Sequence, residues 1–143
     1  WKKPEATAKA FAGGWFNTGD LGQVDSDGHF SIVGRLKDMI ISGGANLYPA
    51  EIEQAIEGHP AVAGAAVIGV PDAKWGEVGK AIVELKPGAS LTLETLLSFL
   101  KDRLGKFKLP KYLKVVDSLP RTPASAKIQK FMLKERHGGA NND

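Results

Sequence analysis

The apolar positions of the chain predict one helix most clearly, in its second half. Leucines recur there every three or four residues, as they do along the side of a helix that packs on a core. They are Leu93, Leu96, Leu97, Leu100 and Leu104. The same spacing predicts a shorter helix from Pro49 to Glu57, where Gly58 is placed to end it. We expect a third helix over residues 128–135.

Three further apolar stretches have the lengths of strands. Residues 61–70 form an almost continuous apolar run, which is typical of a strand buried on both faces. Residues 80–85 and 112–116 add two more strands. Near the N-terminus, short alternating strands at 21–24 and 29–33 flank an Asp-Ser-Asp-Gly turn and predict a β-hairpin. The expected fold class is therefore α+β (α/β), with a small three-stranded sheet flanked by helices and preceded by this hairpin.

A polar joint, Gly34-Arg35-Leu36-Lys37-Asp38, separates the hairpin from the rest of the chain. It leads into a short apolar strand at 39–41, a Ser42-Gly43-Gly44-Ala45-Asn46 turn and the helix that opens at Pro49. Paired glycines allow a backbone to turn sharply or to lie close to a ligand. By its residues alone, this stretch is equally an ordinary strand-turn-helix connection with a solvated joint.

Composition excludes several classes of protein. At 143 residues the chain has the size of one domain, and 43% hydrophobic with 24% charged residues is ordinary for a globular protein. A net charge of +3 is too small to indicate nucleic-acid binding. No apolar run reaches the roughly 20 residues of a membrane span, and no signal peptide heads the chain. The absence of cysteine excludes disulfides and fits a reducing compartment, so we expect a cytoplasmic protein.

Common catalytic and metal motifs are missing from the sequence. It contains no Gly-x-x-x-x-Gly-Lys-Ser/Thr phosphate loop, no Gly-x-Gly-x-x-Gly and no Gly-x-Ser-x-Gly. His29, His59 and His137 stand far apart and lack the spacing of metal ligands. We therefore expect no metal site in this chain. The first residue is Trp1 rather than Met, which suits a fragment or a trimmed product.

Three stretches resemble, in order, motifs of the adenylate-forming enzymes, which include acyl-CoA synthetases, luciferases and peptide-synthetase adenylation domains. Gly14-Trp15-Phe16-Asn17-Thr18-Gly19-Asp20 resembles their ribose-binding motif. The segment from Gly34 to Glu53 resembles their hinge and the loop that follows it. Leu119-Pro120-Arg121-Thr122-Pro123, followed by Lys127-Ile128-Gln129-Lys130, resembles their catalytic-lysine motif. The chain is thereby identified as the C-terminal domain of an acyl-CoA synthetase-type ligase.

This resemblance implies a division of the chain at the joint. Residues 1–36 would be the end of a large N-terminal domain, residues 37–136 a mobile lid domain, and residues 137–143 a disordered tail. The implied reaction joins a carboxylate to ATP, giving an acyl-adenylate and pyrophosphate, after which the thiol of CoA displaces AMP. The lid would rotate between these steps. ATP with Mg²⁺ would be bound mainly by the N-terminal domain, and the other partners would be a small carboxylic acid and CoA.

Lys127 matches the catalytic lysine of the family. Adenylation develops negative charge on phosphate and carboxylate oxygens, which a cation stabilises. Two departures affect the match: Ala126 stands where the family has glycine, and Lys127 follows Pro120 by seven residues, one more than in the family pattern. Lys130 is the alternative catalytic residue. By residue chemistry alone, Lys127 would be an exposed lysine at the start of a helix.

The resemblance also assigns residues to ATP and to the hinge. Asp20 matches the acid that binds the ribose hydroxyls of ATP, and a carboxylate can accept from two neighbouring hydroxyls at once. Arg35 matches an arginine that contacts the same ribose, and Lys127 would complete the ATP/AMP contacts. Lys37 occupies the hinge position, where a change in backbone angles would swing the lid. The structural alternative for Lys37 is a plain exposed lysine.

The CoA site implied by the resemblance combines a glycine turn, two aromatic residues and nearby lysines. The turn would border the pantetheine arm, the rings would stack on adenine, and the lysines would meet phosphates. These residues are Ser42, Gly43, Gly44, Trp75, Phe107, Lys108 and Lys111, with Lys106 beside them. Core packing and a solvated basic face are the structural alternatives. Two other functions stay open: the lid of a peptide-synthetase adenylation domain that loads a carrier protein, and a non-catalytic binding module.

Overall fold

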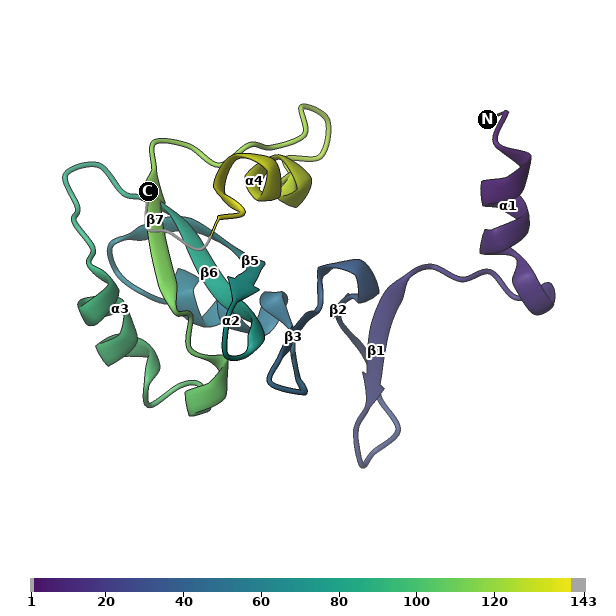
Figure 1. Cartoon of the computed structure of the whole chain (residues 1–143), viewed down its shortest axis with the longest axis horizontal. Coiled ribbons are helices and arrows are strands. Elements are labelled where there is room, and N and C mark those ends of the chain that lie inside the picture. Colours follow the sequence, from purple (N-terminus) through teal and green to yellow (C-terminus); the bar gives the residue numbers. More distant parts are fainter. Residues whose placement is uncertain (1, 140–143) are drawn as a thin grey trace. The chain divides into compact units, whose positions relative to one another are not determined.

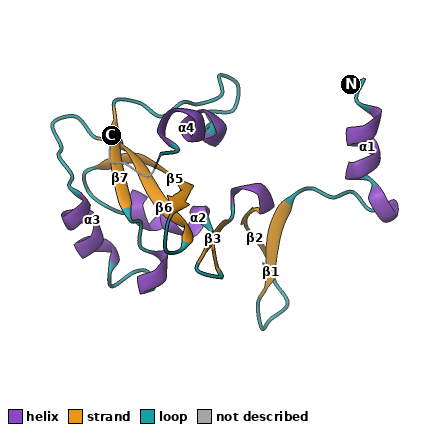
Figure 2. Ribbon diagram, in the orientation of Figure 1, coloured by secondary structure: helices purple, strands orange, loops and turns teal. Residues whose placement is uncertain are grey.

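The computed structural model describes residues 2–139, which form two compact units divided between Lys37 and Asp38. We call residues 2–37 the hairpin unit and residues 38–139 the sheet unit. Both combine helices with strands, which confirms the predicted α+β class (Figures 1 and 2). Across the described residues, no helix has the length and apolar character needed to cross a membrane.

The hairpin unit is built on the predicted pair of antiparallel strands, β1 (Asp20–Val24) and β2 (Phe30–Arg35). The helix α1 (Pro4–Ala10) and the 3₁₀ turn η1 (Ala12–Gly14) precede them. A second 3₁₀ turn, η2 (Leu36–Asp38), follows β2 and crosses the division between the units.

Side chains of the hairpin unit have no core of their own. None of residues 2–37 is buried, and Trp15 is 84% exposed. The Asp25 carboxylate shapes the turn between β1 and β2 by accepting the backbone N–H groups of Asp27 and His29, both at 2.9 Å. A two-stranded hairpin with an uncovered apolar face is marginally stable by itself. The geometry of this unit therefore rests on local contacts, which are hydrogen bonds, a contact between the Phe11 and Phe16 rings and an ion pair between Asp20 and Arg35.

The sheet unit holds the remaining elements. In chain order they are β3 (Ile40–Ser42), β4 (Ala45–Leu47), α2 (Pro49–Glu57), β5 (Val62–Asp72), β6 (Gly76–Leu85), α3 (Leu93–Leu100), η3 (Lys106–Lys108), β7 (Tyr112–Val116) and α4 (Lys130–His137). The sheet has the order β4-β3-β6-β5, and β7 pairs with β6 in parallel.

The predicted count of three strands is wrong, because the sheet in the described part of the chain has five. The additional strands, β3 and β4, form a hairpin of three residues each, joined through Gly43 and Gly44 with φ of +56° and +84°. This hairpin reaches the sheet through one pair, Ser42 with Gly76. Strands so short leave almost no periodicity in a sequence, so the pattern could not reveal that they join the sheet.

The strands β5 and β6 are longer than predicted because Asp72 forms a tight turn between them. Its Oδ1 accepts the backbone N–H groups of Lys74 and Trp75, both at 2.9 Å. Such an Asx turn reverses the chain within a few residues. Pairing between β5 and β6 therefore continues to Asp72 and Gly76, whereas the predicted strands ended at residue 70 and began at residue 80.

Helices cover both faces of the sheet, which explains the continuous apolar run in β5. Successive side chains of a strand point to opposite faces. Ala65 and Val67 pack with α2 and α3, whereas Ala66 and Ile68 pack with Leu133 of α4. The predicted burial of both faces of this strand is confirmed.

Two helix boundaries differ from the prediction. The helix expected over 128–135 is α4 and begins at Lys130, because Ile128 instead forms a β-bridge with Arg121. His137, expected in the tail, is the last residue of α4, and residues 140–143 lie outside the described residues. The leucine helix α3 ends at Leu100 and continues as a turn, with its N-terminus capped reciprocally by the side chains of Thr92 and Thr95.

Lys80 is the exception to an apolar interior. It is 1% exposed, lies on β6 between two residues that face α4, and its Nζ donates to the carbonyl oxygen of Gly139 at 3.2 Å. Gly139 directly follows Gly138, the C-cap residue of α4, and a buried cation is stabilised when it is hydrogen-bonded. Lys80 thus helps to hold the C-terminal end of α4 on the sheet.

Candidate functional site

A narrow hairpin between β7 and α4 carries Lys127. Arg121 and Ile128 form its β-bridge, and Thr122 pairs with Lys127 just beyond it. The Thr122 N–H donates to the Lys127 carbonyl at 2.9 Å, and the Lys127 N–H donates to Thr122 Oγ1 at 3.2 Å. The backbone of Lys127 is therefore held at both its donor and its acceptor.

The extra residue of this loop is absorbed in the turn before Lys127. The N–H of Ala126 donates to the carbonyl of Thr122 at 3.0 Å, which closes the turn over residues 123–126. Ala126 has φ of +53°, in the left-handed region that favours glycine. Ala126, which stands where the family has glycine, thus has a backbone conformation that favours glycine. Lys127 is nevertheless paired with Thr122.

Lys127 and Lys130, the two candidate catalytic lysines, differ in their ion pairing. Lys127 is exposed, and its side chain forms no ion pair with any residue from 2 to 139. Lys130 Nζ lies 2.7 Å from Glu53 Oε1, which also accepts the N–H of Val67 at 2.7 Å. Lys130 therefore ties α4 to α2 and β5, whereas Lys127 is available to a ligand.

A pocket of about 350 Å³ lies in the sheet unit, between the β3–β4 turn, the β5–β6 turn and η3. Most of the predicted CoA residues line it: Ser42, Gly43, Trp75, Phe107 and Lys111. Its other lining residues are Ala45, Leu47, Val78, Gly79, Lys106 and Leu109. The pocket gathers segments that are far apart in the sequence, which is how a binding site differs from a run of surface residues.

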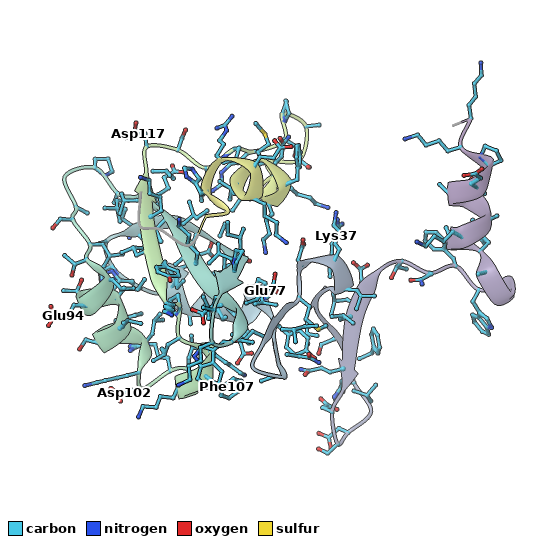
Figure 3. All side chains as sticks on the ribbon, viewed as in Figure 1. Lys37, Glu77, Glu94, Asp102, Phe107 and Asp117 are labelled. Atoms are coloured by element: carbon cyan, nitrogen blue, oxygen red, sulfur yellow. The ribbon has the colours of Figure 1, made fainter. Side chains whose placement is uncertain are left out.

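The contact between Gly43 and Trp75 forms one wall of this pocket. The Gly43 N–H donates to the Trp75 carbonyl at 2.8 Å. A Cβ at Gly43 would lie 2.5 Å from the Trp75 ring, so the ring rests directly on the glycine backbone. Trp75 stays 46% exposed and Phe107, labelled in Figure 3, stays 57% exposed. Lys74 Nζ lies over the Trp75 ring, 4.7 Å from its centroid, and Lys108 Nζ lies 5.6 Å from that of Phe107, so a flat ligand would share these rings with lysine side chains.

The lysines near the pocket differ in what they bind. Lys108 donates to both carboxylate oxygens of Glu51 on α2, at 2.6 and 2.8 Å, and does not line the pocket. Gly44 is also absent from the lining. Lys106 does line the pocket, and within the described residues it forms no ion pair. Lys106 therefore takes the place expected of Lys108 and lines the pocket together with Lys111.

Lys111 lines the pocket as half of an ion pair with Asp72, whose side chain is 4% exposed. The hydrogen bond from Lys111, with further ones from the N–H groups of Trp75 and Lys74, lowers the pKa of Asp72 to about 2. The same hydrogen bond raises the pKa of Lys111. Lys111 is thus firmly charged, but part of its field is neutralised by Asp72.

The residues predicted to bind ribose come together in the hairpin unit. Asp20 and Arg35 are register partners in β1 and β2, and Arg35 Nε lies 3.5 Å from Asp20 Oδ1. Beside them is an open pocket of about 460 Å³ lined by Asn17, Thr18, Gly19, Arg35, Leu36 and Lys37. The hairpin register therefore brings together two residues that are fifteen positions apart in the sequence.

The β1–β2 turn holds a grouping that the sequence analysis missed. Ligand atoms of Asp25, Asp27 and His29 lie within 4.8 Å of one another, all on exposed side chains. The sequence signal for this grouping is the spacing Asp-x-Asp-x-His, which the distances between the three histidines do not reveal. Hydrogen bonds from the turn, first of all from the His29 backbone, lower the pKa of Asp25. These contacts account for the turn.

Comparisons with known proteins identify the family of this chain. Residues 51–126 match the family described as AMP-binding enzyme C-terminal domain. A feruloyl-CoA synthase from Amycolatopsis sp is 51% identical over 138 residues, which are 96% of this chain and 28% of that protein. A fatty acid–[acyl-carrier-protein] ligase, ScoC, from Streptomyces coeruleorubidus is 46% identical over 97% of this chain and 27% of its own length. The structure of ATP-bound MatB from Rhodopseudomonas palustris superposes with a TM-score of 0.86, at 44% identity, over 96% of this chain and 27% of that one. The chain thus spans little more than a quarter of the proteins it matches.

Proposed function

Because this chain belongs to the family of AMP-binding enzyme C-terminal domains, we propose that it is the mobile lid of an ATP-dependent carboxylic acid:CoA ligase. In the first step a carboxylate oxygen attacks the α-phosphorus of ATP, and pyrophosphate leaves. In the second step the CoA thiolate attacks the acyl carbon, and AMP leaves as the thioester forms. The pocket beside Trp75, which gathers apolar rings and cations from three segments, is the observation that carries the proposal.

In the adenylation step, we assign to Lys127 the role of stabilising the developing negative charge. A preorganised cation lowers the barrier only if it is held in place and is not neutralised by a neighbour. The backbone bonds between Lys127 and Thr122 support the first condition by fixing the point from which the side chain departs, and the absence of an ion pair to any described residue supports the second. Lys130, paired with Glu53, meets the first condition alone.

Asp20 and Arg35 would bind the ribose hydroxyls of ATP. Arg35 holds the Asp20 carboxylate by one ion pair, which leaves further acceptor positions on that carboxylate for hydroxyl donors. Within the described residues, the carboxylate grouping that could hold a cation is the exposed turn at Asp25. Residues 2–139 therefore offer no ligand set for Mg²⁺ beside Lys127, and we assign the metal to ATP bound by the rest of a longer protein.

In the thioester step, CoA would lie in the sheet-unit pocket. Its adenine would stack on Trp75 and Phe107, its phosphates would meet Lys106 and Lys111, and the pantetheine arm would follow the Ser42–Gly43 backbone. Gly44 would set the turn, and Lys108 would hold η3 on α2. A rotation of the lid at Lys37 would move Lys127 away from the reacting groups and bring this pocket to them.

A carrier protein is a second candidate for the acyl acceptor, because the chain is similar to ScoC, a fatty acid–[acyl-carrier-protein] ligase. A carrier protein presents the same pantetheine arm without the adenosine phosphates. In that case the Ser42–Gly43 wall would still be used, but Trp75, Phe107 and Lys106 would not contact a nucleotide.

The test is binding of CoA and of a phosphopantetheinylated carrier protein to this chain, measured by isothermal titration calorimetry. For a CoA ligase we expect CoA to bind, with a weaker affinity in Lys106→Ala and Trp75→Ala and an unchanged affinity in Lys101→Ala, a surface control on the turn after α3. Binding of the carrier alone would favour the second acceptor. Absence of binding by either ligand would contradict both.

For the adenylation role, Lys127→Ala in the full-length ligase should reduce adenylate formation by about 10²–10³-fold. Thioester formation from supplied acyl-adenylate should be largely spared, since Lys127 would leave the reacting groups when the lid rotates. Normal adenylation in Lys127→Ala with a severe loss in Lys130→Ala would assign the role to Lys130.

A further inference from the structure

Arg121 connects the Lys127 loop to the sheet. Its Nη1 donates to the carbonyl oxygen of Ala126 at 3.2 Å. Its other terminal nitrogen, Nη2, lies over Gly64 of β5, where a Cβ would stand only 2.9 Å away. The pairing of β5 with β6 shifts register between Val62 and Gly64, so the strand is irregular where the guanidinium rests. Gly64 thus leaves the space that the Arg121 guanidinium fills.

The carbonyl that Arg121 binds belongs to the peptide unit joining Ala126 to Lys127. A peptide unit is planar, so fixing its oxygen and its N–H fixes the direction in which the next residue leaves. Arg121 binds the oxygen, and Thr122 Oγ1 accepts the N–H at 3.2 Å. Two side chains therefore set the orientation of the backbone from which the Lys127 side chain departs.

This peptide unit needs holding because Ala126 has φ of +53°. An L-residue with a Cβ is crowded in the left-handed region, and leaving that region lowers its free energy. To leave it, Ala126 must rotate the peptide units on either side, and the one after it carries the Lys127 N–H. A glycine at this position would feel no such force. The alanine makes the loop depend on an external contact.

We infer that Arg121 is a positioning residue for Lys127: its guanidinium, seated on Gly64, holds the Ala126–Lys127 peptide so that the lysine keeps one direction. This inference rests on the proposed adenylation function of Lys127. Arg121 itself contacts neither the substrate nor the reacting atoms. Its effect is to keep the amine of Lys127 where the charge develops, and misplacement of a catalytic group by about 1 Å can reduce a rate by about 10²-fold.

Four variants of the full-length protein test this role. Arg121→Ala removes the contact, Arg121→Lys keeps a donor but not the planar fork, and Gly64→Ala displaces the guanidinium while leaving Arg121 in place. The main clash in Gly64→Ala is with the end of the flexible Arg121 side chain, but a Cβ there would also lie 3.3 Å from Cδ1 of the buried Leu119, so the Tm of this variant is measured beside its rates. Arg103→Ala is the matched control, because Arg103 also donates to a carbonyl, that of Phe99 at 2.7 Å, but in α3.

We expect Arg121→Ala to lower kcat of adenylation by at least about tenfold, with KM for ATP and the acid unchanged and thioester formation from supplied acyl-adenylate spared. Arg121→Lys should recover part of the rate. Gly64→Ala should show the same defect, and the double variant should be no worse than Arg121→Ala, since both remove one contact. Arg103→Ala should match the wild-type protein. Equal loss of both half-reactions, in proportion to the fall in Tm, would overturn the inference.

Amide hydrogen exchange in this chain gives a second readout that needs no activity. The Lys127 N–H should exchange at least about tenfold faster in Arg121→Ala and Gly64→Ala, while amides of α3 keep their wild-type rates. If the wild-type protein forms no adenylate, the proposed function is wrong. The exchange rates alone then show whether Arg121 holds the backbone of Lys127. Unchanged protection of Lys127 in both variants would then overturn the inference.

Discussion

At the scale of single residues, the position before the proposed catalytic lysine shows how a backbone angle explains a departure in sequence. Ala126 has φ of +53°, where the family pattern has glycine. An alanine in this region costs about 1–2 kcal/mol, while a glycine adds about 0.4–1 kcal/mol of unfolded-state entropy. The first value exceeds the second, so the natural residue is the less stable choice.

We therefore expect Ala126→Gly to raise the free energy of unfolding by about 0.5–1 kcal/mol, the difference between these two terms. Urea unfolding of the chain measures it. The control is Ala124→Gly in the same loop: Ala124 is not among the residues with positive φ, so glycine there should only destabilise. A loss of stability in both variants would show that Ala126 is not strained.

The ion pair between Lys111 and Asp72 predicts a pH dependence at the pocket. The pKa of Asp72 is lowered to about 2, from an ordinary value of 3.8. A depressed carboxylate pKa stabilises the folded state above the unfolded pKa, and this stabilisation is lost as pH falls through the folded pKa. The turn at Trp75 should therefore stay intact at pH 4 and open between about pH 4 and 2.

The Trp75 indole NMR resonance, followed through an acid titration, measures this opening. Asp72→Asn should abolish the transition in that pH window, because the asparagine amide does not titrate. Asp102→Asn, which changes an exposed carboxylate on the turn after α3, is the matched control and should leave the transition in place. A midpoint near 3.8 in the wild-type chain would contradict the ion pair.

Residue types at the candidate site could be predicted from the sequence, but their pairing could not. Trp75, Phe107 and the Ser42–Gly43 turn were expected to share a site, and they line one pocket. Lys106 and Lys108, two positions apart in a 3₁₀ turn, were indistinguishable in the sequence. Glu51, 57 residues away, binds Lys108 and leaves Lys106 to the pocket. Such distant partners depend on packing, which no local pattern encodes.

At the scale of elements, prediction succeeded where an apolar pattern extended over many residues. It failed where a single residue pair determined the boundary or the pairing of an element. The leucine stripe and the apolar run at 61–70 correspond to α3 and β5, because a repeated pattern reflects burial against a large surface. The start of α4 was placed two residues early, since the bridge between Arg121 and Ile128 extends the chain there. The hairpin of β3 and β4 was missed as part of the sheet because it joins through one residue pair.

The joint between the units is short because both of its ends are anchored. On one side the Leu36 N–H donates to the Gly19 carbonyl at 2.9 Å, within the hairpin unit. On the other, Ile40 is buried and the Ile41 N–H donates to Glu77 Oε2 at 3.3 Å, within the sheet unit. Lys37 lies between these anchors and is labelled with Glu77 in Figure 3. A hinge motion would thus concentrate on the backbone angles of residues 37–39.

Proline at position 37 should separate a hinge from a plain linker. Proline fixes φ near −65° and removes a backbone donor, so Lys37→Pro in the full-length ligase should trap one arrangement of the lid. We expect near-normal adenylate formation with thioester formation nearly abolished. Lys37→Ala, which loses the charge but keeps the backbone freedom, should retain both rates.

The two half-reaction rates are measured side by side, together with Tm. If both rates of Lys37→Pro fall in parallel and follow the loss in Tm, Lys37 is only a linker residue. A similar step-specific loss in Lys37→Ala would assign the effect to the lysine charge and not to its backbone.

At the scale of the whole molecule, the chain holds the proposed lid but only a part of an active site. It spans 28% of the feruloyl-CoA synthase it resembles, and it has no phosphate-binding loop of its own. We therefore expect the chain alone to form no acyl-adenylate. Carboxylate-dependent exchange of pyrophosphate into ATP measures this reaction, with the Lys127→Ala chain as the blank. Exchange above that blank would show that the chain holds a complete adenylation site.

The two units should also differ in stability when the chain is studied alone. The sheet unit has a core of buried residues on both faces of its sheet, whereas no residue from 2 to 37 is buried. Large apolar side chains of the hairpin unit, Trp15, Phe30 and Ile32, are exposed, as expected if the rest of a longer protein covers them. Amides in such a unit open by local unfolding at little cost in free energy.

Hydrogen exchange followed by mass spectrometry should therefore show β5 and β6 protected to the level of global unfolding, and β1 and β2 exchanging within seconds. The same peptides in the full-length protein are the control, and there β1 and β2 should be protected, because their exposed apolar face would be covered. Protection of β1 and β2 in the chain alone would contradict this view, since it would require the hairpin to be stable without a core. Equal, fast exchange in both proteins would show that nothing covers the hairpin, and would remove the need for an N-terminal partner at this surface.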